Sequence, residues 1–147
     1  MIKIKDVLAR KGAEVVTIHE DQSIHDAIKF LVQHNIGAVL VRDEGGEIVG
    51  IVSERDILRE GSRNSEKLKE TRVKTVMTRD LIVCEPDHTI EYVEQVMVKN
   101  NIRHLPVIAE NKLTGILSMR DVVRARLKDA EVENRYLRDY IEGKYPG

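Results

Sequence analysis

The stretch GIVSERDIL at residues 50–58 returns later in the chain as GILSMRDVV at residues 115–123. Glycine, isoleucine, serine, arginine and aspartate keep their places, and the other positions are apolar with one exception. A serine followed three residues later by an acidic residue is typical of a helix-capping box. Each copy therefore predicts a strand that ends at the serine and a helix that begins directly after it.

The repetition extends over most of the chain. Residues 15–41 align with residues 81–107 without a gap, and KDVLAR at 5–10 matches KTVMTR at 74–79. Each copy is predicted to form a strand, a helix, a hairpin and a second helix. Ser23 and Thr89 are the predicted caps of the first helices, whose apolar stripes are Ile24, Ala27, Ile28, Leu31 and Val32, and Ile90, Val93, Val96 and Met97. The predicted boundaries are 1–61 for repeat 1, 62–73 for a connector, 74–128 for repeat 2 and 129–147 for a helical extension.

Neither copy is large enough to bury its apolar faces alone. We therefore expect an α+β fold in which two β-α-β-β-α repeats pack sheet to sheet about a pseudo-twofold axis. From Met119 to Glu142 the chain reads as one long polar helix. Its apolar seam is too short for an independent coiled coil, and we expect it to pack against its counterpart in a homodimer or against its own module. The seam consists of Val123, Leu127, Ala130, Asn134, Leu137 and Ile141.

The composition and the sequence pattern argue against several classes of function. The net charge of −1 and the aromatic content of 3% argue against a general nucleic-acid binder. No apolar run is long enough to span a membrane and the N-terminus lacks signal-peptide features, so a cytoplasmic protein is expected. The single cysteine, Cys84, has no partner for an internal disulfide, and the five histidines lack metal-ligand spacing. With no recognisable catalytic constellation, we expect neither an enzyme nor a metal or catalytic cofactor.

The repeated unit, ending in Gly-apolar-apolar-Ser-x-x-Asp and containing a strand such as IRHLPV, resembles a CBS domain. Two such units in tandem resemble a CBS pair, or Bateman module, over roughly residues 5–127. In its short length and polar tail the chain is similar to stand-alone bacterial CBS pairs. The resemblance implies a regulatory module that senses AMP, ADP, ATP or NAD(H), or alternatively S-adenosylmethionine. It would transmit ligand binding to an unidentified partner protein through a conformational or oligomeric change.

The resemblance also implies two adenosine sites, each combining the serine and aspartate of one copy with strand residues of the other. A carboxylate can accept hydrogen bonds from both ribose hydroxyls, and a serine hydroxyl, an arginine and the N–H groups at a helix start suit phosphate oxygens. One implied site combines Ser118, Arg120 and Asp121 with Val16, Ile36, Gly37 and Ala38. The other combines Ser53, Arg55 and Asp56 with Ile82, Ile102, Arg103 and His104, and Pro106 is expected at an edge or irregular position beside it.

Two interpretations of these residues stay open. Arg103 and His104 add positive charge, so a phosphorylated ligand is favoured over free adenosine, although Arg103 could be a surface charge and His104 an interface residue. The Ser-x-x-Asp motifs could also serve only as helix caps in an interaction or oligomerisation module that binds no nucleotide. Capping does not explain Arg55 and Arg120 at matching positions, and the repetition therefore favours binding.

Overall fold

The computed structural model describes residues 1–12 and 15–143, except the side chain of Tyr140; residues 144–147 of the predicted extension lie outside this range. The chain forms two compact units. Residues 15–81 make up the N-terminal unit, and residues 1–12 together with 82–143 make up the C-terminal unit. The first helix thus packs with the second repeat, although the boundary drawn from the sequence places it in repeat 1.

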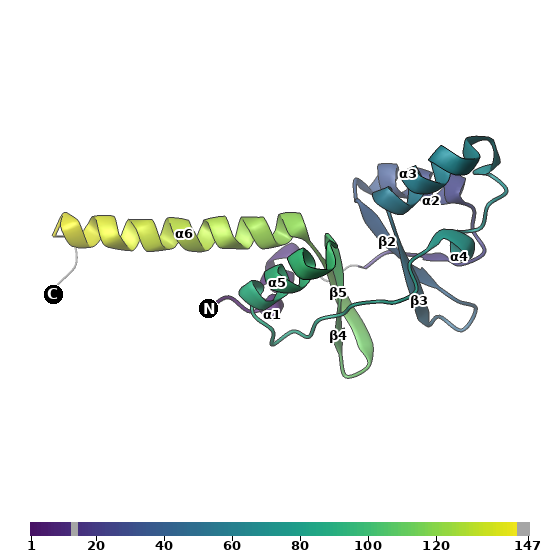
Figure 1. Cartoon of the computed structure of the whole chain (residues 1–147). Helices are drawn as coiled ribbons and strands as arrows, with labels where there is room; N and C mark the ends of the chain where they lie inside the picture. Colours follow the sequence, from purple (N-terminus) through teal and green to yellow (C-terminus); the bar gives the residue numbers. More distant parts are fainter. Residues whose placement is uncertain (13–14, 144–147) are drawn as a thin grey trace. The chain divides into compact units, whose positions relative to one another are not determined.

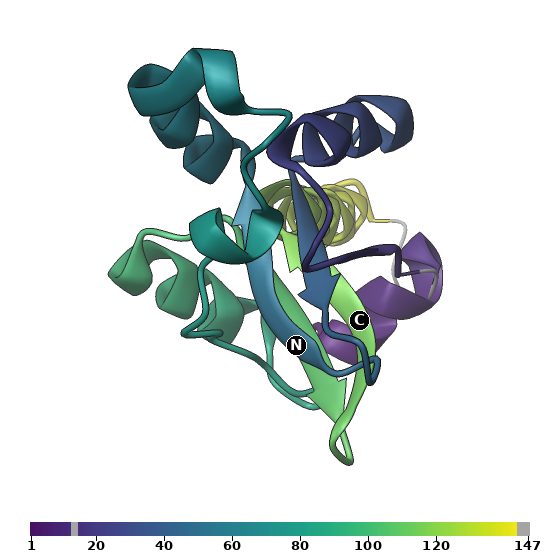
Figure 2. The ribbon, with the colours of Figure 1, turned by 90° about the vertical axis from the view of Figure 1, so that its right-hand side faces the viewer.

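The N-terminal unit is a three-stranded sheet with helices on one side (Figures 1 and 2). The central strand β2 pairs parallel with β1 and antiparallel with β3. In chain order the elements are β1 (Thr17–His19), α2 (Ile24–His34), β2 (Ala38–Arg42), β3 (Ile48–Ser53), α3 (Glu54–Asn64), the 3₁₀ helix η1 (Ser65–Lys67) and α4 (Val73–Val76). Helix α3 and η1 occupy much of the stretch predicted as a polar connector.

The predicted cap and stripe of α2 are largely confirmed. Ser23 Oγ accepts a hydrogen bond from the N–H of Asp26 at 3.0 Å, and Ile24, Ala27 and Leu31 are buried. They form a core with apolar residues of β2 and β3. Val32, predicted on the same stripe, is 76% exposed, because the buried stripe follows positions three and four apart and Val32 lies at its border.

The C-terminal unit is built around one hairpin. Its elements are α1 (Ile4–Lys11), α5 (Ile90–Asn100), β4 (His104–Ala109), β5 (Lys112–Ser118) and α6 (Met119–Ile141). Strand β4 pairs antiparallel with β5, and residues of α1, α5, β4, β5 and α6 share one buried core. The start of α1 is attached to the loop before α5, because Ile4 N–H donates to His88 O and Lys5 N–H donates to Pro86 O, both at 2.9 Å.

The first strand predicted for repeat 2 is reduced to a single parallel bridge between Cys84 and Val107. In repeat 1 the matching strand β1 pairs Thr17 with Leu40, whose aligned counterpart is Pro106. A proline has no N–H to donate to that ladder, so pairing cannot extend. Pro106 pairs with Ile116 within β4 and β5, and the register shift between Val107 and Ile108 has a counterpart between Val41 and Arg42 in repeat 1, where no proline is present.

The long C-terminal helix is confirmed. Helix α6 runs from Met119 to Ile141, and the buried residues among its described side chains, Val122 and Ala125, lie in its first turns. In Figure 1 the rest of α6 extends past α1 and α5 of its own unit. None of the helices in the described part of the chain is both long enough and apolar enough to cross a membrane.

Candidate functional site

The predicted capping box at the start of α3 is present. Ser53 N–H donates to Asp56 Oδ2 at 2.9 Å, and Asp56 N–H donates to Ser53 Oγ at 3.4 Å. The Ser53 hydroxyl also donates to Asp56 Oδ2 at 3.1 Å. Among the described residues, the second carboxylate oxygen, Oδ1, has the hydroxyl of Thr78 as its one hydrogen-bond partner, at 3.5 Å. Capping therefore occupies one oxygen of Asp56 and leaves the other available for a ligand.

The start of α6 repeats this arrangement with an additional cation. Ser118 N–H donates to Asp121 Oδ2 at 2.8 Å, and Asp121 N–H donates to Ser118 Oγ at 3.1 Å. The ammonium group of Lys11 donates to Asp121 Oδ2 at 2.7 Å and to the carbonyl of Ile116 at 2.8 Å.

The ion pair changes the electrostatics of Asp121. Burial by itself raises the pKa of this carboxyl, whose side chain is only 12% exposed. Hydrogen bonds from Lys11 and from Ser118 outweigh that effect, and the pKa of Asp121 is lowered below its ordinary value. Asp121 is therefore ionised at neutral pH, and the ammonium group of Lys11 balances its charge.

Each unit also brings its own strand start next to its own Ser-x-x-Asp motif. Glu54 N–H donates to Gly37 O at 3.0 Å, and Met119 N–H donates to Arg103 O at 2.8 Å. We call the two groups the N-terminal half-site (Ser53, Arg55 and Asp56 with residues 36–38) and the C-terminal half-site (Ser118, Arg120 and Asp121 with residues 102–104). The combination of residues from opposite copies stays a prediction.

The other predicted residues have the following placements. Arg55, Arg103 and Arg120 are exposed, as phosphate-binding side chains must be before a ligand arrives. Val16 and Ile82 are half-buried in the segments before β1 and before the Cys84 bridge, Ile36, Gly37, Ile102 and His104 are half-buried, and Ala38 and Pro106 are buried.

The repeated glycines have a packing role. A Cβ atom on Gly50 would lie 2.5 Å from Met77 Sδ, and one on Gly115 would lie 2.8 Å from Leu8 Cδ2. Leu8 and Met77 thus occupy matching places under the two hairpins. Each hairpin approaches the segment beneath it so closely that no side chain fits between them.

Lys11 was missed by sequence reasoning, although the repeat contained a weak signal. Continuing the match of KDVLAR to KTVMTR by one residue sets Lys11 opposite Asp80, a reversal of charge. After α4 the chain leaves the helical conformation, and Thr78 N–H donates to Ile51 O at 2.9 Å. Helix α1 instead continues to Lys11, and its ammonium group reaches Ile116 O, the carbonyl that matches Ile51 O.

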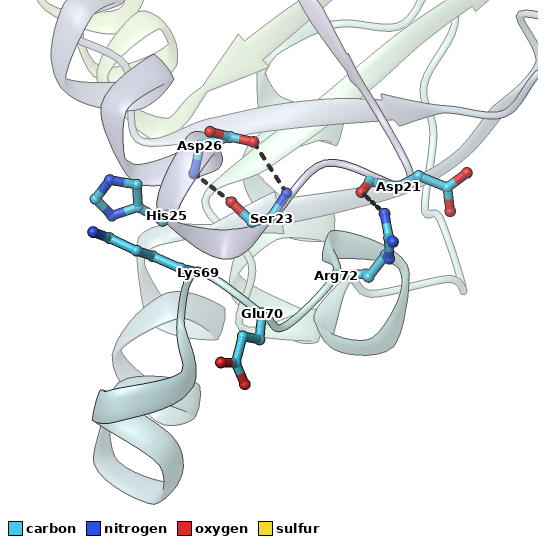
Figure 3. Close-up of a pocket in the computed structure, with 7 residues that line it drawn as sticks. All are labelled: Asp21, Ser23, His25, Asp26, Lys69, Glu70 and Arg72. Atoms are coloured by element: carbon cyan, nitrogen blue, oxygen red, sulfur yellow. Dashed lines mark hydrogen bonds between the residues drawn. The ribbon is translucent and has the colours of Figure 1, made fainter.

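Two cavities in the N-terminal unit lie elsewhere. Figure 3 shows one of about 470 Å³, in which Ser23 Oγ accepts the N–H of Asp26 at 3.0 Å and Arg72 Nη1 donates to Asp21 O at 2.6 Å. Its lining is Asp21, Ser23, His25, Asp26, Lys69, Glu70 and Arg72. The other, of about 460 Å³, is a mainly apolar groove between α2 and α3 that includes Ile36 and Leu58. Only Ile36 among the predicted binding residues lines either cavity.

Two further groups have ordinary structural explanations. His19, Asp21 and Glu44 bring possible metal-ligand atoms within 4.8 Å of one another. His19 Nδ1 accepts the N–H of Asp21 at 3.1 Å, and Asp21 is paired with Lys74 at 2.9 Å, so hydrogen bonding and ion pairing account for the positions of these two side chains without a metal. Burial raises the pKa of the Cys84 thiol to about 11, which keeps it protonated and unsuited to nucleophilic chemistry.

Known proteins resemble this chain over most of its length. The family described as CBS domain matches residues 4–63 and 73–128. The chain is 35% identical to CBS domain-containing protein CBSX3, mitochondrial, of Arabidopsis thaliana, over 97% of this chain and 73% of that protein. The crystal structure of the CBS-domain containing protein ATU1752 from Agrobacterium tumefaciens has 37% identity and a TM-score of 0.82, over 84% of this chain and 92% of that one.

A further solved structure contains ligands. It is the CBS domain pair of protein MJ0100 in complex with 5′-methylthioadenosine and S-adenosyl-L-methionine. It has 29% identity and a TM-score of 0.77, over 88% of this chain and 98% of that one.

Proposed function

The chain belongs to the CBS-domain family as a tandem pair of such domains, and from that premise we propose that it is a regulatory module that binds adenosine-containing ligands. The observation that carries this proposal is the geometry of the two capping boxes. In each, the cap uses the Oδ2 atom of the aspartate, and Oδ1 lies beside a serine at the start of a helix and is available to a ligand. The adenosine compounds bound to the domain pair of protein MJ0100 support the same ligand class.

The proposed binding mode assigns a role to each group. Asp56 Oδ1 and Asp121 Oδ1 accept hydrogen bonds from the ribose hydroxyls, while Arg55 and Arg120 face phosphate oxygens. Strand residues of the opposite copy complete each site, as the resemblance implies. AMP, ADP, ATP and NAD(H) are the proposed ligands, and S-adenosylmethionine is the alternative. The chain itself catalyses no reaction and acts in the cytoplasm on a partner protein.

A thermal-shift panel of these compounds and 5′-methylthioadenosine tests the proposal. A ligand present at about one hundred times its dissociation constant stabilises the folded protein by about 2.7 kcal/mol, which raises the melting temperature by several degrees. Guanosine monophosphate is the control, since it has the same ribose and phosphate with another base. No shift with any adenosine compound at millimolar concentration would refute the proposed ligand class.

A second function, self-association, is favoured by the exposed apolar seam of α6. Leu127, Leu137 and Ile141 are 60% exposed or more although they repeat at coiled-coil spacing. The two repeats also expose apolar side chains at matching positions, Val32 with Leu58 and Val98 with Val123. We propose that the occupant of these faces is a second copy of the chain, in a homodimer formed through the CBS repeats and α6.

Charge complementarity favours a parallel α6 pair in register. In that arrangement Asn134 faces its own counterpart, where two asparagines can hydrogen-bond, and Glu133 faces the partner's Arg138 on both sides. Leu137→Asp should therefore reduce dimerisation measured by analytical ultracentrifugation. Val132→Asp, at a site of similar exposure outside the seam, is the matched control. Equal sedimentation of wild type and Leu137→Asp as dimers would exclude α6 from the interface.

A further inference from the structure

The ammonium group of Lys11 retains hydrogen-bonding capacity toward a ligand. An ammonium has three N–H donors, and two of them are used by Asp121 and Ile116. The Lys11 side chain is 37% exposed and therefore partly open to solvent, and among the described residues only these two acceptors bond its ammonium group.

The N-terminal half-site lacks this cation. The group beside Asp56 Oδ1 is the neutral hydroxyl of Thr78, and the residue aligned with Lys11 is Asp80. The hydroxyl of Ser53 donates to Asp56. Arg55 and Arg120 occupy matching positions, so they do not distinguish the two half-sites. Beside the two aspartates the difference in charge comes from Lys11, and Arg103 directly before β4 is a further difference, since its aligned residue is Gly37.

We propose that Lys11 is a specificity-determining residue that makes the C-terminal half-site select adenosine ligands carrying a phosphate group. This inference rests on the proposed function. A phosphate oxygen can accept the third N–H of Lys11, and charge-assisted bonds of this kind are stronger than neutral ones. The ammonium also offsets the repulsion between a phosphate and Asp121. At the N-terminal half-site the described residues place the hydroxyl of Thr78 and no lysine beside Asp56, so the selection by Lys11 belongs to the C-terminal half-site alone.

Isothermal titration calorimetry with AMP and 5′-methylthioadenosine tests this assignment. The Asp56→Asn variant isolates the C-terminal half-site, since an asparagine oxygen can still cap the helix but lacks the charge. In that background Lys11→Met should weaken AMP binding about tenfold or more, while the affinity for 5′-methylthioadenosine changes less than about twofold. Lys11→Arg should retain the preference for AMP. Lys5→Met is the matched control, because Lys5 lies on the same helix but pairs with Asp87 at 3.2 Å.

The outcomes separate the possibilities. If Lys11→Met weakens the binding of both ligands equally, Lys11 only supports the structure. If the affinity for AMP is unchanged, Lys11 does not contact the phosphate. Either result overturns the assignment. If Lys5→Met abolishes the preference for AMP as fully as Lys11→Met does, the assignment is also overturned. The preference would then depend on the net charge of the protein and not on Lys11. If wild-type protein binds neither compound, the proposed function itself fails and the assignment fails with it.

Discussion

The two half-sites begin from almost the same nine residues and differ in their electrostatics. Asp56 lies beside the neutral hydroxyl of Thr78, whereas Asp121 is paired with the ammonium of Lys11. The source of the difference lies outside the repeated motif: α4 is one turn long and its chain pairs with Ile51, whereas α1 has eight residues and ends at Lys11. The same spacing of serine and aspartate thus produces the same cap in both repeats but not the same binding chemistry.

The largest expected effect is the loss of one binding event in each of two single variants. Asp56→Asn and Asp121→Asn should each weaken one of the two proposed sites about a hundredfold, because the carboxylate is the proposed acceptor for both ribose hydroxyls. Calorimetric stoichiometry with the preferred ligand measures this directly. Asp26→Asn, which changes a capping box outside both half-sites, is the control. Two sites remaining in both variants would contradict the roles given to these carboxylates.

The next effect is on the free energy of unfolding, and it compares the contacts beneath Gly50 and Gly115 in the two hairpins. Gly50→Ala places a Cβ 2.5 Å from Met77 Sδ and 3.0 Å from the backbone carbonyl of Thr78, while Gly115→Ala meets only the side chain of Leu8. Because a backbone carbonyl yields less readily than a leucine methyl group, Gly50→Ala should cost about 1–3 kcal/mol and Gly115→Ala less. Urea denaturation of both variants provides the comparison. Gly61→Ala is the control without a steric contact, since its Cβ would meet open space, and it should raise stability by about 0.5–1 kcal/mol because alanine favours the helix α3.

The smallest effect is the pH dependence of the Lys11–Asp121 pair. The folded-state pKa of Asp121 is lowered, so the stability it contributes is present above its unfolded pKa and is lost as the pH falls through the folded value. Lys11→Met should reduce the free energy of unfolding by about 1 kcal/mol or less at pH 7, since the lysine is partly exposed. The difference from wild type should disappear at acidic pH, where Asp121 is protonated.

Denaturation series from neutral to acidic pH measure that difference. Lys99→Met is the control, because Lys99 is an exposed helical lysine with no ion pair among the described residues. A stability difference that stays constant down to the most acidic pH would show that Lys11 stabilises the unit through packing and not through Asp121.

Local features of the fold were predictable from sequence. Ser23, Ser53 and Thr89 cap helices as expected, because a cap needs only residues within one helical turn. The hairpins and the long C-terminal helix follow equally from local patterns of apolar and turn residues. The exposure of Val32 and the missing strand beside Pro106 could not be predicted with the same accuracy, because each depends on which element lies against it.

The sequence by itself determined the repeat, its caps and its family, and it placed serine, arginine and aspartate at the start of two helices. Only the tertiary structure decided that Lys11 belongs beside Asp121, more than a hundred positions along the chain. The reason is physical: a cap closes over a few residues, whereas an ion pair between distant residues requires α1 to pack in the C-terminal unit. That packing gives two nearly identical motifs unequal charge.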